Sequence, residues 1–69
     1  MIRQRVHSSD LESIGYEEAT QTLEIEFHGS HIYQYSNVPI NLYEGLIHAS
    51  SHGTFFNDYI KGHFQYHRV

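Results

Sequence analysis

The sequence contains no cysteine and no long apolar run, and each absence excludes a class of protein. Without cysteine the chain has neither disulfides nor a thiolate zinc site. No segment approaches the roughly 18 to 20 apolar residues of a membrane-spanning helix. The N-terminal segment MIRQRVHSSD has no apolar run behind its arginines, so it does not predict a signal peptide. We therefore expect a soluble cytoplasmic protein with no membrane partner.

Cations are also scarce. The chain has four Lys and Arg residues against eight Asp and Glu, and its net charge is −4 with neutral histidines. This balance counts against a strong nonspecific nucleic-acid binder, which usually carries a basic surplus. All four cations lie near the two ends of the chain, so they form one basic patch if the ends meet in space. They are Arg3, Arg5, Lys61 and Arg68.

Aromatic residues, by contrast, are abundant. The 69 residues include six tyrosines and four phenylalanines. A chain of this length forms one domain, residues 1–69, that buries only about 60% of its unfolded surface. Large rings supply much apolar area to so small a core, which helps a short chain to fold.

The first half of the chain predicts three strands. They cover Leu11–Tyr16, Thr22–Phe27 and His31–Ser36. The clearest is TLEIEF, in which Leu23, Ile25 and Phe27 alternate with polar residues, as in a strand with one buried face. Successive short strands joined by turns indicate an antiparallel meander.

The turn between the last two strands leaves two registers open. A two-residue type II′ turn at Gly29-Ser30 pairs Phe27 with Ile32, and Tyr33 and Tyr35 then lie opposite the apolar face. A three-residue loop, residues 28–30, pairs Phe27 with His31 and places both tyrosines on the apolar face. One residue of register reverses every side chain. We favour the two-residue turn, because it also places Ile32 with the apolar set.

After Val38-Pro39 the spacing of the apolar residues changes from that of a strand to that of a helix. Ile40, Tyr43 and Ile47 recur at helical spacing, and Asn41 with Glu44 suggests a capping box. Thr54 is a suitable cap for a second short helix that ends at Gly62. The tail, residues 63–69, is expected to be extended. The fold class is therefore α+β: a three-stranded antiparallel meander followed by two short helices on one face of the sheet.

The ordered set of these segments resembles the KTSC domain family. The resemblance runs from SSDLESIGY through TLEIEF, YQY and NVP to LYEGLIHASSHGTFFNDYI and the final YHRV. It departs from the usual family pattern at Glu17, His52 and Gln65. Members are short domains that stand alone in bacteria and phages or lie at the C-terminus of some lysyl-tRNA synthetases. The family's function is unknown, and the synthetase context implies RNA binding.

The tyrosines of YQY, Tyr33 and Tyr35, have two interpretations. On an exposed sheet face they form a platform on which bases stack, at roughly 1 to 3 kcal/mol each. Alternatively they belong to the core, as most rings in so small a domain do. The cations either contact phosphates or are solvated surface charges.

Two further features have weak signals. SSHGTFFN, residues 50–57, either presents helix amides to an anion or only joins two helix caps. His48/His52 and His63/His67 are four residues apart, but Ser50, Ser51 and Gly53 interrupt the helix of the first pair and the second pair follows Gly62, so we expect no metal site. No nucleophile motif is present, and we expect neither catalysis nor a cofactor.

We therefore expect a noncatalytic domain that binds RNA weakly and in a salt-dependent way. Tyr33, Tyr35 and Tyr66 would stack bases, and Arg3, Arg5, Lys61 and Arg68 would contact phosphates. The alternative is a protein-interaction module that uses an aromatic patch or an edge strand, and that binds another protein or itself.

Overall fold

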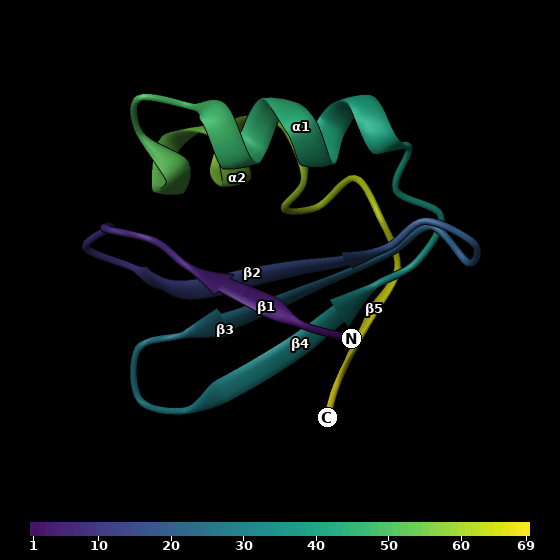
Figure 1. Ribbon diagram of the computed structural model, residues 1–69, viewed down its shortest axis with the longest axis horizontal. Coiled ribbons are helices and arrows are strands. Elements are labelled where there is room, and N and C mark those ends of the chain that lie inside the picture. Colours follow the sequence, from purple (N-terminus) through teal and green to yellow (C-terminus); the bar gives the residue numbers. More distant parts are fainter.

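Two helices cover one face of a five-stranded antiparallel sheet (Figure 1). The computed structural model describes every residue from Met1 to Val69. The strands lie side by side in sequence order. Along the chain, both helices come between β4 and β5, although these two strands are neighbours in the sheet. The elements are β1 (Arg3–Arg5), β2 (Leu11–Glu17), β3 (Thr22–Phe27), β4 (His31–Tyr35), α1 (Ile40–His48), α2 (His52–Tyr59) and β5 (Tyr66–Arg68).

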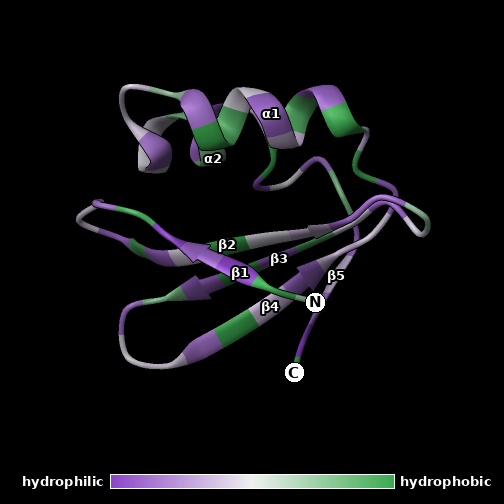
Figure 2. Cartoon of the chain, viewed as in Figure 1, coloured by the Kyte–Doolittle hydropathy of each residue, from purple (hydrophilic) through white to green (hydrophobic).

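The hydrophobic core lies between the sheet and the helices. Apolar and polar residues alternate along the central strands, as the period-2 pattern predicts (Figure 2). Strands and helices both contribute to the core, whose buried hydrophobic members are Leu11, Ile14, Leu23, Ile25, Tyr35, Val38, Leu46, Phe56 and Ile60. The α+β class with helices on one face is confirmed.

The sheet has five strands rather than the three that the sequence predicts. β1 pairs with β2 in the register Arg3 to Gly15, and β5 pairs with β4 in the register Tyr35 to Tyr66. β1 crosses Gly15 so closely that an added Cβ would lie 2.9 Å from Arg3 Cγ. The expected extended tail exists, and pairing with β4 turns it into the edge strand β5. Three-residue strands carry too little alternation for sequence periodicity to reveal them.

A β-bulge brings Leu11 into the core. Leu11 pairs with Phe27 and Ser13 pairs with Glu26, so Glu12 is the extra residue. Without the extra residue, Leu11 and Ile14 would face opposite sides of the sheet. With it, both side chains are fully buried.

The favoured register of the hairpin between β3 and β4 is wrong, and the alternative is the observed one. Phe27 pairs with His31 and Ile25 with Tyr33, around a three-residue loop. The reason lies outside the hairpin: the His28 amide donates to the Asp10 carbonyl at 3.1 Å. His28 is thereby attached to the loop before β2 and does not enter the ladder with β4. Gly29 and Ser30 complete the loop with φ of +94° and +66°.

Both helices begin earlier than their expected caps. α1 begins directly after Pro39, and no side chain caps it, so the capping box at Asn41 is wrong. α2 begins after Ser51, whose hydroxyl accepts from the Thr54 amide at 3.2 Å, so Ser51 rather than Thr54 is the cap. The chain leaves the second helix through Gly62, which has a φ of +82°. Neither helix has the length and apolar character needed to cross a bilayer.

We expect Leu23→Ala to lower the free energy of unfolding by roughly 2 to 5 kcal/mol, because Leu23 is fully buried in the middle of the sheet. Chemical denaturation followed by circular dichroism measures this change. Ile2→Ala is the matched control, since Ile2 is 94% exposed and its truncation should change stability little. Equal losses in both variants would contradict the assigned core face.

Candidate nucleic-acid interface

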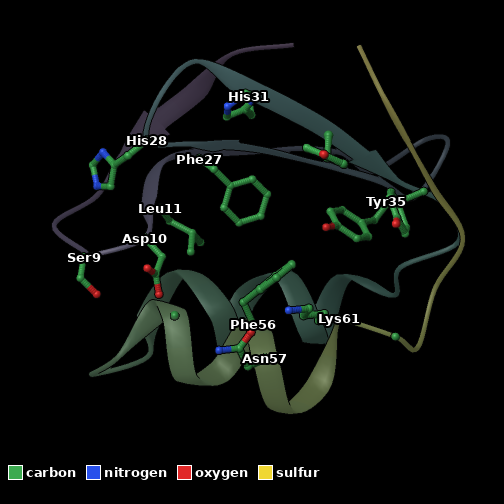
Figure 3. A pocket seen from close by; sticks show the side chains of 14 residues that line it. Ser9, Asp10, Leu11, Phe27, His28, His31, Tyr35, Phe56, Asn57 and Lys61 are labelled. Carbon is green, nitrogen blue, oxygen red and sulfur yellow. The ribbon is translucent and has the colours of Figure 1, made fainter.

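A groove of about 640 Å³ opens between the sheet and α2 (Figure 3). Phenylalanine and tyrosine side chains from β3, β4, β5 and α2 line part of it, together with polar groups from α2 and from the loops. The volume is in the range of small-molecule sites. Its lining comprises Ser9, Asp10, Leu11, Phe27, His28, His31, Tyr33, Tyr35, Gly53, Phe56, Asn57, Lys61, Gly62 and Tyr66.

Five aromatic rings make one continuous cluster along this groove. The Tyr33 ring lies edge-on to Phe27, with centroids 5.7 Å apart, and tilts against Tyr66 at 5.6 Å. Tyr35 contacts both Tyr66, at 5.4 Å, and Phe56, at 5.5 Å. The cluster grades from interior to surface: Phe56 is 5% exposed and Tyr66 is 58% exposed. A flat ligand therefore meets the cluster at its Tyr66 and Tyr33 end.

Tyr35 cannot provide an open stacking surface, because it is 5% exposed. Burial, followed by the neighbouring Tyr66 and Tyr33 hydroxyls, raises the pKa of Tyr35 to about 12. The expectation that Tyr35 forms part of an exposed platform is thus wrong, and the cause is the hairpin register described above. Tyr35 instead packs against the Tyr66 ring from the core side.

Two of the four cations lie on the groove side. Lys61, just after α2, lines the groove (Figure 3). Arg68 pairs across the ladder with Tyr33, and its Nη2 donates to His31 Nδ1 at 2.7 Å. Both cations therefore lie on the face of the sheet that carries the aromatic cluster.

The other two cations lie on the opposite face of the sheet. Cross-strand pairing places Arg3 in one row with Gly15, Glu24 and Gln34, on the face away from the core. Arg3 pairs with Glu24, and its Nε donates to Ser13 Oγ at 2.9 Å. Arg5 pairs with Glu12. The chain ends do not combine into one basic patch, and the expectation that all four cations share a surface is wrong.

The Arg3–Glu24 ion pair on that face is supported by further hydrogen bonds. Glu24 is only 8% exposed, and burial alone would raise its pKa. Hydrogen bonds from Gln34 and Arg3 outweigh burial, so the net pKa of Glu24 is lowered. Arg3 is therefore engaged within the protein.

The glycine-containing turn before α2 joins two helix ends. The Ser51 hydroxyl accepts a hydrogen bond from the Thr54 amide. The Asp10 carboxylate lies over the first turn of the helix, 3.1 Å from the position that a Cβ on Gly53 would take. A carboxylate already stands where an anion would bind, which favours the capping interpretation.

The paired histidines do not converge. His52 Nδ1 donates to the Leu46 carbonyl at 2.8 Å, and no group of three His, Asp or Glu side chains is arranged to hold a metal ion. His28 and His31, which border the loop between β3 and β4, both line the groove instead.

Several groove residues were not expected from the sequence. Asp10, Asn57 and Phe56 converge there from two separate places in the chain: the loop before β2 supplies Asp10, and α2 supplies Phe56 and Asn57. Phe56 lies four residues before Ile60, which is a helical spacing of apolar residues. The acid and the amide carry no periodic pattern.

Comparison with known proteins agrees with this fold. The KTSC domain profile matches residues 7–64. A crystal structure of a KTSC domain protein from Yersinia pestis superposes with a TM-score of 0.96 at 40% identity, and the match covers 99% of this chain and 96% of that one. An uncharacterized protein of Stutzerimonas stutzeri is 39% identical over 100% of this chain and 99% of its own length.

A larger protein contains a similar segment. Lysine–tRNA ligase of Nostoc sp. is 41% identical over 61 residues, which cover 88% of this chain and 11% of the ligase. This chain thus spans about a tenth of that relative. Because the family profile and the solved structure both match nearly the whole length, the chain belongs to the KTSC domain family.

We expect a pH-dependent stability contribution from His28 at the mouth of the groove. Its Nε2 bonds the Ser8 carbonyl at 2.9 Å and its Nδ1 lies 2.7 Å from Glu12. The Ser8 carbonyl first, and then Glu12 and Asp10, raise the pKa of His28. A raised folded-state pKa stabilises the fold below the ordinary value of about 6.5, and the contribution is lost as pH rises through the raised value.

Thermal melts of the wild type and His28→Gln at several pH values test this expectation. The melting temperature of the wild type should exceed that of His28→Gln by more at pH 5.5 than at pH 8.5. Glu12→Gln should reduce the same excess, because it removes the acceptor at Nδ1. An excess that is constant with pH would show that His28 is not protonated in this cluster.

Proposed function

We propose that this domain binds single-stranded RNA, without catalysis, in the groove between the sheet and α2. One observation carries the proposal: a continuous aromatic cluster reaches the surface at Tyr66, next to the half-buried Tyr33, on the face that also carries the cations Lys61 and Arg68. In this arrangement a base stacks on the exposed rings and the adjacent phosphates meet the cations. A cytoplasmic location is part of the same proposal.

The aromatic groups suit stacking on a base. Tyr66 is 58% exposed, and the tilt of 46° between its ring and that of Tyr33 leaves an angled surface. Stacking of a base on an aromatic ring is worth about 1 to 3 kcal/mol and requires no particular base. Tyr35 and Phe56, both buried, lie behind the exposed Tyr66 ring and the half-buried Tyr33 ring.

The charges support weak binding despite the net charge of −4. Glu24 and Glu26 are paired with Arg3 on the opposite face of the sheet, and Glu12 is paired with Arg5 and His28. The groove itself is lined by one carboxylate, Asp10, against Lys61, and Arg68 stands beside it. Two phosphate contacts on a single strand give a slope of about −1.4 in log affinity against log salt.

The relatives add context to the proposal. A similar segment occurs within lysine–tRNA ligases, whose name states that they act on tRNA. A small domain attached to such an enzyme is well placed to contact RNA. Fold similarity does not establish function, so the groove carries the argument.

The proposal predicts which variants lose RNA affinity. Amide chemical shifts recorded during titration with a five-nucleotide oligo(U) RNA at low salt should move around Tyr33, Lys61 and Tyr66. Tyr66→Ala should weaken binding about 5- to 150-fold, which corresponds to the loss of one stacked base. Lys61→Gln should weaken it and make the salt slope shallower by about 0.7.

Arg5→Gln is the matched control, because Arg5 lies on the opposite face in an ion pair with Glu12. It should leave affinity nearly unchanged. No shift change at millimolar RNA, or shift changes confined to the face that carries Arg3 and Arg5, would overturn the proposed interface.

A second candidate is association through a sheet edge. Both outer strands, β1 and β5, have an unpaired side, and Ile2 and Val69 beside them are 94% and 61% exposed. Exposed edges are templates for strand pairing with another chain. Sedimentation without RNA tests this candidate: a mass twice 8.1 kDa supports it, and a monomer up to millimolar concentration removes self-pairing.

A further inference from the structure

The two sides of the groove differ in chemistry. The sheet side presents the rings of Phe27, Tyr33 and Tyr66, whereas the α2 side presents the Asn57 amide and, over its first turn, the Asp10 carboxylate (Figure 3). Rings alone would accept any base. The Asp10 carboxylate lies at the His28 end of the groove, away from Tyr35 and its neighbour Tyr66 (Figure 3). A base that enters far enough to reach Phe27 therefore also meets hydrogen-bonding groups that can distinguish one base from another.

The Asp10 carboxylate is positioned by its backbone. The Asp10 amide donates to the Ser8 hydroxyl at 3.2 Å, and the Asp10 carbonyl accepts from the His28 amide at 3.1 Å. The Ser8 hydroxyl also accepts from the Leu11 amide at 3.2 Å, so this turn is closed by Ser8 and not by the Asp10 side chain. The carboxylate faces the first turn of α2 at one end of the groove, and no side chain donates a hydrogen bond to it.

Gly53 provides the space for this carboxylate. Gly53 is buried, and an added Cβ would come within 3.1 Å of Asp10 Oδ2. Asn57 follows Gly53 by four residues along α2, so the two share one face of that helix. The carboxylate and the amide therefore lie along the same side of the groove.

We propose, resting on the RNA-binding function above, that this groove selects a guanine base. Guanine presents two adjacent donors on its Watson–Crick edge, N1–H and the N2 amino group, and a carboxylate accepts both at once. Asn57 offers an amide donor for the neighbouring O6. Adenine and cytosine each place a ring acceptor beside a single amino donor, and uracil has one N–H between two carbonyls, so each meets Asp10 less well.

The test compares five-nucleotide RNAs that differ only at the central base, with uridines elsewhere. The central bases are guanine, hypoxanthine, adenine and uracil, and tyrosine fluorescence or amide shifts give the affinities. Guanine should bind about 5- to 150-fold more tightly than adenine or uracil, the range for one bidentate contact. Hypoxanthine lacks only the N2 amino group, so its affinity should fall well below that of guanine.

Asp10→Asn should abolish the guanine preference while oligo(U) still binds. Asp58→Asn, the same change in an exposed residue of α2 that lines a separate shallow groove, should keep the preference. If Asp10→Asn melts below the assay temperature, the comparison of guanine with hypoxanthine on the wild type decides by itself. Equal binding of all four RNAs overturns the guanine inference and leaves RNA binding standing, whereas absence of binding to any of them overturns both.

Discussion

The attachment of His28 to the loop before β2 is the constraint on which the groove depends. The His28 amide bonds Asp10 and its ring bonds Ser8 and Glu12, so this residue is withdrawn from the β3–β4 ladder. The hairpin then closes with Phe27 opposite His31. Because strand side chains alternate, this choice places Tyr33 and Tyr35 on the face that the helices cover. A hairpin shorter by one residue would place both rings among the ion pairs of the other face.

The same attachment brings the groove's polar end into position. Asp10 and His28 border one mouth of the groove, and both owe their positions to the contact between the two loops. The β-bulge at Glu12 adds to this arrangement, because it turns Leu11 inward beneath Phe27 and frees Glu12 to meet His28 and Arg5. One local irregularity thus supports the core and the mouth of the groove together.

The two faces of the sheet separate charge from aromatic surface. Arg3 and Arg5 neutralise carboxylates of β2 and β3 on the open face, which leaves Lys61 and Arg68 beside the rings on the other. A net charge describes the whole molecule, but a ligand responds to the local field. An acidic protein can therefore present a groove whose one lining carboxylate, Asp10, is balanced by Lys61, with Arg68 beside it.

The sequence determined the class of fold and most of the core. Alternation in TLEIEF and helical spacing after Pro39 identify the buried faces, because those periods follow from backbone geometry alone. It also identified the aromatic cluster in part, since Tyr33, Tyr35 and Tyr66 all belong to it. Tertiary structure decided the hairpin register, the two edge strands, the burial of Tyr35 and the separation of the four cations. These depend on contacts between residues far apart in the chain, such as His28 with Asp10, and such contacts leave no periodic trace in a single sequence.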